Sequence, residues 1–138
     1  MIPMRVESVG VVPGNRGLVV VLREETGSRL LVMEIGPLEA NSIGMELEGI
    51  RPPRPMTHDL FVNALQNLNT RVTRATVVEL RDSTFFATLT IETSEGVVNL
   101  DSRPSDAIAV ALRCEAPIYC LPGVLEEAGI DAGEPQVH

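Results

Sequence analysis

Residues 100–113 read LDSRPSDAIAVALR, and this stretch marks a passage from a strand into a buried helix. Pro104 suits the first position of a helix, because its φ is already helical and its missing N–H would have no partner there. Asp106 then lies in the first turn, where unpaired backbone N–H groups and the helix dipole stabilise a carboxylate. We therefore predict a strand that ends at Ser102 and a helix over residues 104–113.

On either side of this stretch, the sequence alternates between strand-like runs and turns. The runs are β-branched or alternate in hydropathy, and the segments between them, such as PGNRG (13–17), have turn composition. In residues 57–68, apolar positions from Phe61 to Leu68 recur at helical spacing behind Thr57, a candidate N-cap, which predicts a helix with a buried stripe. We expect strands at 5–12, 18–24, 29–35, 71–80, 84–92, 96–102 and 117–121, and helices at 38–48, 57–68, 104–113 and 123–129.

The two halves of the sequence share features in the same order, which suggests an internal repeat. RVESVGVV (5–12) matches RVTRATVV (71–78) at both ends, and EIGPLEANSIGMEL (34–47) aligns with DSRPSDAIAVALRC (101–114). We expect one α+β domain over residues 1–130, built from two copies (about 5–68 and 71–130), and a frayed tail over 131–138. The mainly antiparallel strands would either pack as two sheets or close into a six-stranded barrel with flanking helices.

The charge of the chain limits its partners. The net charge is −8, and all 11 cations are arginines. An acidic chain repels nucleic acid at long range, which argues against a passive, sequence-independent DNA-binding protein. A few clustered arginines can still bind phosphate through their planar forks. Because no apolar run is long enough to span a bilayer and no secretory signal pattern is visible, we expect a cytoplasmic protein without a membrane partner.

Two acids near the opening stretch suggest a metal site. Asp101 at the strand end and Asp106 in the first helical turn offer hard oxygen ligands of the kind that Mg²⁺ or Mn²⁺ prefers. Glu34 and Glu39 repeat this spacing in the first half, but Gly36 stands there in place of Arg103. In the structural alternative, Asp106 binds no metal and simply stabilises the first turn of the helix through the helix dipole.

Two further clusters carry polar side chains that are candidates for catalysis. His58 and Asp59 open a helix with Arg54 just upstream, and a histidine near neutral pKa can act as acid, base or ligand. Arg81 and Asp82 lie in a hairpin turn, where Asp82 is also an ordinary turn former. In both clusters the local structural role alone accounts for the residue types.

Three strings in this order and spacing resemble the bifunctional nuclease family. These strings are EGIRPPRPMTHDLFVNAL (48–65), VVELRDSTFFATL (77–89) and VNLDSRPSDAIAVALRCEAPIYC (98–120). The resemblance spans roughly residues 4–130. It implies a nuclease that acts on RNA and DNA by divalent-metal-assisted phosphodiester hydrolysis, and a homodimer.

Carried onto this chain, the polar positions of the family motifs are Arg54, His58, Asp59, Arg81, Asp82, Asp101, Arg103, Ser105 and Asp106. From their chemistry, we expect the two aspartates Asp101 and Asp106 to hold one Mg²⁺ or Mn²⁺, and His58 to act as base or leaving-group acid. The arginines would bind nonbridging phosphate oxygens. The alternative is a non-catalytic ligand- or protein-binding module that functions as a dimer.

Overall fold

A computed structural model describes residues 1–132 of the chain. In chain order its elements are β1 (Ile2–Gly10), β2 (Val19–Glu24), β3 (Arg29–Glu34), α1 (Pro37–Leu47), α2 (Thr57–Asn67), β4 (Arg71–Arg81), β5 (Thr84–Thr93), β6 (Gly96–Ser102), α3 (Pro104–Arg113), β7 (Ile118–Cys120), α4 (Pro122–Ala128) and β8 (Ile130–Asp131). The α+β class is therefore confirmed, and each predicted strand and helix is present.

The eight strands form one open, mixed sheet in the order β6-β5-β4-β7-β1-β2-β3-β8. Neighbouring strands are antiparallel except for β4 and β7, which run parallel. The barrel prediction is wrong, because the short β7 joins the two three-stranded units side by side and leaves β6 and β8 as edges. Both halves contain three strands followed by a helix, while the duplication itself stays a prediction.

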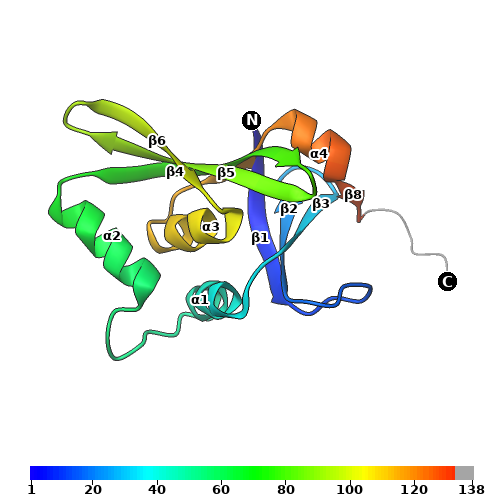
Figure 1. The fold of residues 1–138 in the computed structure, drawn as a ribbon, viewed down its shortest axis with the longest axis horizontal. Coiled ribbons are helices and arrows are strands. Elements are labelled where there is room, and N and C mark those ends of the chain that lie inside the picture. Colours follow the sequence, from blue (N-terminus) through cyan, green and yellow to red (C-terminus); the bar gives the residue numbers. More distant parts are fainter. Residues whose placement is uncertain (133–138) are drawn as a thin grey trace.

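Three helices lie together on one side of the sheet, with α3 in contact with both α1 and α2 (Figure 1). Residues 107–111 of α3 are buried, and three of them are alanines, which allow neighbouring elements to approach closely. The smaller α4 packs against β3 and β4. This arrangement places the first turns of α2 and α3 close to the end of β6.

The buried side of α2 differs from the predicted stripe. Val62 is the buried apolar residue of this helix, while Phe61 is 39% and Leu68 is 72% exposed. The N-cap is Met56, so Thr57 is the first helical residue and not the predicted N-cap. His58 and Asp59 contact α3 on the same side as Val62. As a result, α2 turns polar side chains toward α3.

The end of the described chain pairs with the sheet. Ile130 and Asp131 pair with β3, and Ala132 donates a backbone hydrogen bond to Ser28. The remaining residues of the predicted tail, 133–138, lie outside the described residues. Within residues 1–132, no helix has the length and hydropathy needed to cross a bilayer.

Candidate functional site

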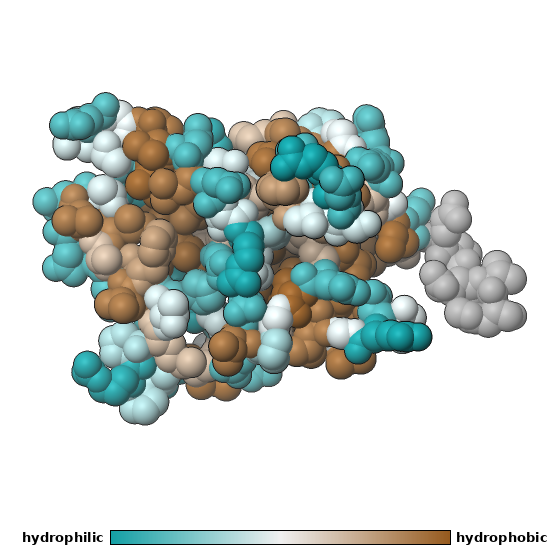
Figure 2. Space-filling view, in the orientation of Figure 1, coloured by the Kyte–Doolittle hydropathy of each residue, from teal (hydrophilic) through white to brown (hydrophobic). Residues whose placement is uncertain are grey.

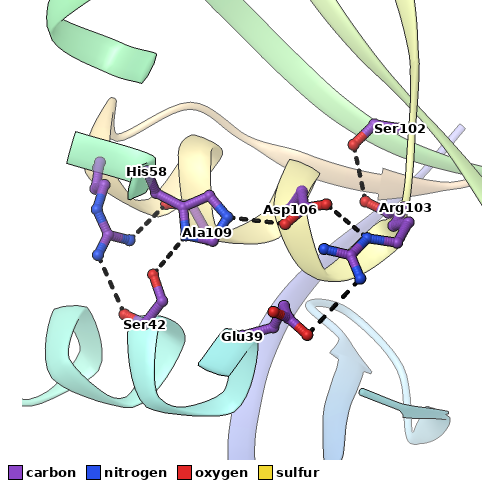
Figure 3. Close-up of polar contacts among 8 residues, drawn as sticks. Glu39, Ser42, His58, Ser102, Arg103, Asp106 and Ala109 are labelled. Atoms are coloured by element: carbon purple, nitrogen blue, oxygen red, sulfur yellow. Dashed lines mark hydrogen bonds and ion pairs between the residues drawn. The ribbon is translucent and has the colours of Figure 1, made fainter. Parts of the chain in front are cut away.

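His58 connects three helices through its two ring nitrogens (Figure 3). Nδ1 lies 2.6 Å from Ser42 Oγ on α1, and Nε2 lies 2.8 Å from Asp106 Oδ1 on α3. An ionised carboxylate can only accept, so Nε2 carries the proton that faces Asp106. In the neutral ring, Nδ1 then accepts from the Ser42 hydroxyl, and the imidazole is held in one tautomer and orientation.

Arg103 binds the other oxygen of the same carboxylate. Its Nε donates to Asp106 Oδ2 over 2.8 Å, and its Nη1 lies 3.7 Å from Glu39 Oε1 (Figure 3). Burial alone would raise the pKa of Asp106, but hydrogen bonds from Arg103 and His58 outweigh it and lower the pKa below its ordinary value. The hydrogen bond to Asp106 raises the pKa of Arg103. The pair is therefore ionised at neutral pH.

A second ion pair joins α2 to α3. It lies one residue further along α2 and seven residues further along α3 than the contact between His58 and Asp106. Arg113 Nε donates to Asp59 Oδ1 over 2.7 Å, and the Arg113 side chain is only 9% exposed. Its other nitrogens donate to the backbone carbonyls of Ala109 and Ser42. The Met56 N–H lowers the pKa of Asp59, and Arg113 adds to this against the opposing effect of burial. This pair fixes α2 against the other two helices.

His58, Arg103 and Asp106 border a cavity of about 540 Å³ between α2, α3 and the end of β6. Its lining residues are Thr57, His58, Phe61, Leu89, Leu100, Asp101, Ser102, Arg103, Asp106 and Val110. Asp101 borders the cavity at the end of β6, although strand alternation places its side chain with Asn99, on the face opposite Leu100. Four of the predicted site residues, His58, Asp101, Arg103 and Asp106, therefore meet at one cavity.

The structure places the other predicted site residues elsewhere. Arg54 lies exposed before α2 and forms no hydrogen bond or ion pair within residues 1–132. Arg81 pairs with Glu79 over 3.6 Å, and its guanidinium lies 4.5 Å from the centre of the Phe86 ring. Asp82 forms the turn between β4 and β5. Ser105 is only 5% exposed and lines a different cavity.

A comparison with known families identifies the group to which this chain belongs. A family model described as the bifunctional nuclease domain matches residues 20–133. The chain belongs to the bifunctional nuclease domain family.

Several known proteins match most of this chain. An uncharacterized protein of Mycobacterium tuberculosis is 37% identical over 127 residues, which make up 92% of this chain and 76% of that protein. Bifunctional nuclease 1 of Oryza sativa subsp. japonica and bifunctional nuclease of Oryza minuta are each 30% identical over 121 residues. That match makes up 84% of this chain and 36% of each rice protein.

Sequence reasoning missed two residues of this bifunctional nuclease domain that complete the network, Ser42 and Arg113, and it gave Glu39 no role beside Arg103. Asp106 and Arg113 are seven residues apart on α3 and so lie on one helical face. Asp106 pairs with His58 and Arg113 pairs with Asp59, the neighbouring residue of α2. That spacing was available in the sequence. Ser42 and Glu39 lack any such signal, because their partners come from helices whose packing is set by the sheet order.

The family resemblance implies a divalent cation, and the cavity offers part of a site for one. Asp101 and Asp106 provide carboxylate oxygens, and Mg²⁺ commonly uses one or two carboxylates together with waters and substrate phosphates. Both Asp106 oxygens accept from neighbours, although each keeps a second lone pair. Within residues 1–132, no three His, Cys, Asp or Glu side chains are grouped to hold a metal. Two carboxylates, of which Asp106 is already paired with His58 and Arg103, form only part of a donor set, so cation binding stays a prediction.

Proposed function

We propose that this protein is a nuclease that hydrolyses phosphodiester bonds of RNA and DNA in the cavity between α2, α3 and β6. The observation that carries the proposal is the convergence of His58, Arg103 and Asp106 on a cavity that Asp101 also lines. A cation, an acid–base group and two carboxylates are the side chains that this hydrolysis needs. Membership in the bifunctional nuclease domain family supports it.

In this proposal, Arg103 binds the phosphate. Its Nε is held by Asp106, which fixes the direction of the guanidinium, while the side chain remains 65% exposed. Its terminal nitrogens can then bind two nonbridging oxygens of a phosphodiester in a bidentate manner. Negative charge grows on those oxygens in the transition state, so the fixed guanidinium lowers the barrier.

His58 transfers the proton. Both of its ring nitrogens have protein partners, so it must exchange one of them to act on the substrate. Asp106 is the partner at the cavity and keeps its bond to Arg103 when His58 Nε2–H turns to the leaving oxygen. Ser42, 7% exposed on α1, continues to hold Nδ1. To act as the leaving-group acid, His58 starts as the imidazolium, with Nδ1–H donating to Ser42 Oγ, and returns to the neutral ring when the Nε2 proton passes to the leaving oxygen.

Asp101 and Asp106 would hold one Mg²⁺ or Mn²⁺ between them and the substrate phosphate. When bound, this ion lowers the pKa of a coordinated water and neutralises charge on the phosphate. Asp101 is exposed and forms no hydrogen bond or ion pair within residues 1–132, so its carboxylate is available to such a ligand.

The test is a cleavage assay on single-stranded RNA and DNA with Mg²⁺, with Mn²⁺ and with a chelator. We expect cleavage by the wild type that the chelator abolishes, and a loss of about 10- to 100-fold in Asp101→Asn, because a ligand to the ion is weakened. Glu95→Gln is the matched control, since Glu95 is an exposed acid at the other end of β6. Intact substrates with wild-type protein, or equal rates for both variants, would contradict the proposal.

A second candidate is a non-catalytic binding module that functions as a dimer. The observation in its favour is that His58, Asp59, Asp106 and Arg113 already pair with one another or with Ser42, Arg103 and backbone groups. Such a network stabilises three packed helices without any chemistry. The cleavage assay separates the two, because the module binds nucleic acid or another ligand without breaking it.

We also propose that the protein is a cytoplasmic homodimer. Figure 2 shows hydrophobic residues gathered over the region of α2 and the β5–β6 hairpin. The exposed apolar residues of α2 and β6 include Leu60, Phe61, Val97 and Val98. Because β6 is an edge strand with open backbone groups, a second copy can cover both features. Light scattering at micromolar concentration should give twice the chain mass, and a monomer would exclude the dimer.

A further inference from the structure

A second, larger cavity of about 690 Å³ lies next to the proposed catalytic one. It opens between the β4–β5 turn and the points where β3 enters α1 and β6 enters α3. Its lining residues are Asn15, Val32, Met33, Glu34, Ile35, Gly36, Ser83, Thr84, Phe85, Arg103, Pro104 and Ser105. Arg103 lines both cavities, so a phosphate held by its guanidinium would have one cavity on each side.

Ser105 places an unpaired hydroxyl at this second cavity. The residue is only 5% exposed, and within residues 1–132 its side chain forms no hydrogen bond. Every fully buried side-chain nitrogen or oxygen in that part of the chain has a hydrogen-bond partner. The Ser105 hydroxyl is therefore not fully enclosed, and the residue borders this cavity. A hydroxyl that is nearly buried, has no protein partner and borders a cavity can donate to a ligand held there.

The neighbours of Ser105 are suited to a phosphate group. Ser105 is the second residue of α3, whose first N–H groups have no partner in the helix and whose N-cap supplies no side-chain bond. Arg103, the N-cap residue, adds a cation on the same side. Backbone N–H groups, a hydroxyl and a guanidinium together form an anion site at a helix N-terminus.

The far side of the cavity is suited to a nucleoside. Phe85 is half-buried there and offers an aromatic surface, while Ser83, Thr84 and Asn15 offer hydrogen-bonding groups at the rim. Glu34 would repel a phosphate but can accept from a base amino group or a sugar hydroxyl. Ser83 is held at a φ of 63° in the turn, a conformation that non-glycine residues seldom adopt. This turn belongs to the VVELRDSTFFATL string (77–89), of which Leu89 alone lines the proposed catalytic cavity.

We propose that this second cavity binds the nucleotide next to the scissile bond. Its phosphate would lie between Arg103, Ser105 and the first turn of α3, and its nucleoside would lie against Phe85. This inference rests on the proposed nuclease function and assigns Ser105 as a substrate-binding residue. The cavity volume of about 690 Å³ is within the range of about 300–1,000 Å³ usual for small-molecule sites.

The experiment uses adenosine 5′-monophosphate as the probe, because it has no internucleotide bond to cleave. We expect binding by calorimetry that is tighter than that of adenosine or inorganic phosphate alone. We also expect NMR shifts at the amides of Ser83, Thr84 and Ser105. Ser105→Ala should weaken binding about tenfold, the usual effect of losing a hydrogen bond to a charged group. Thr76→Val is the matched control, since it removes an equally buried hydroxyl, at 4% exposure, from β4 and away from this cavity.

The outcomes separate this inference from the nuclease proposal. Binding that depends on Ser105 but is accompanied by no cleavage of RNA or DNA would overturn the nuclease function and leave the nucleotide site standing. Cleavage without mononucleotide binding would overturn the nucleotide site alone, as would shifts confined to the amides around His58. Phosphate that binds as tightly as the nucleotide would also overturn it, because the nucleoside would then contribute nothing. Phe85→Leu provides a second variant, and its expected loss is confined to the nucleotide and the nucleoside.

Discussion

Replacing Arg103 with methionine should lower kcat/KM for oligonucleotide cleavage by about 100-fold or more. Its guanidinium is the fixed cation at the proposed catalytic cavity, and removal of one preorganised donor to a developing charge typically costs about 10²–10³ in rate. Because the side chain is 65% exposed, the fold should tolerate the change. Initial rates on a fluorescent oligonucleotide measure the effect.

Arg71→Met is the control for this variant. Arg71 is 73% exposed and pairs with Glu92 over 3.2 Å on β4 and β5, away from both cavities. Its replacement changes the net charge by the same amount, so any general loss of attraction for nucleic acid appears in both variants. Equal losses in the two proteins would show that Arg103 acts only through overall charge.

Replacing Asp59 with asparagine should destabilise the fold by about 2 kcal/mol at neutral pH. Breaking a buried ion pair costs about 3–5 kcal/mol, and solvent reduces that cost here because Asp59 is 24% exposed. Arg113, at 9% exposure, would lose its charged partner between the helices. Urea unfolding measures the difference, and Glu92→Gln in an exposed pair should change stability by less than about 1 kcal/mol.

The effect of Asp59 should depend on pH. The Met56 N–H and Arg113 hold the pKa of this carboxyl below its ordinary value in the folded protein. A depressed folded pKa stabilises the protein fully above the unfolded pKa of about 3.9, and this contribution is lost as the pH falls through the folded pKa. The stability gap between wild type and Asp59→Asn should therefore shrink below about pH 4. A gap that stays constant down to acid unfolding would contradict this role.

The strand-to-helix junction at residues 100–113 could be predicted because its signals are local. Pro104 sets the first helical turn, and Asp106 complements it within reach of the N-cap residue Arg103. These features depend only on neighbours in the sequence. The contact between Arg103 and Asp106 follows from them.

The packing between distant segments could not be predicted in the same way. The barrel prediction failed because three residues of β7, far along the chain, pair with both β1 and β4 and keep the sheet open. The prediction that the stripe from Phe61 to Leu68 is buried was wrong, because contacts of His58 and Asp59 with α3 turn that side of α2 inward. The ion pair between Arg103 and Glu39 joins the two halves of the chain, and no sequence pattern within either half predicts it.

A double-mutant cycle on cleavage rate tests most directly whether these side chains act as one site. His58→Gln, Arg103→Met and the double variant would be compared under single-turnover conditions, with folding checked by circular dichroism. We expect each single variant to lose most of the rate and the double variant to lose little more, because residues that act as a unit are strongly non-additive. Losses that multiply, or a single variant that cleaves at the wild-type rate, would contradict a shared catalytic centre.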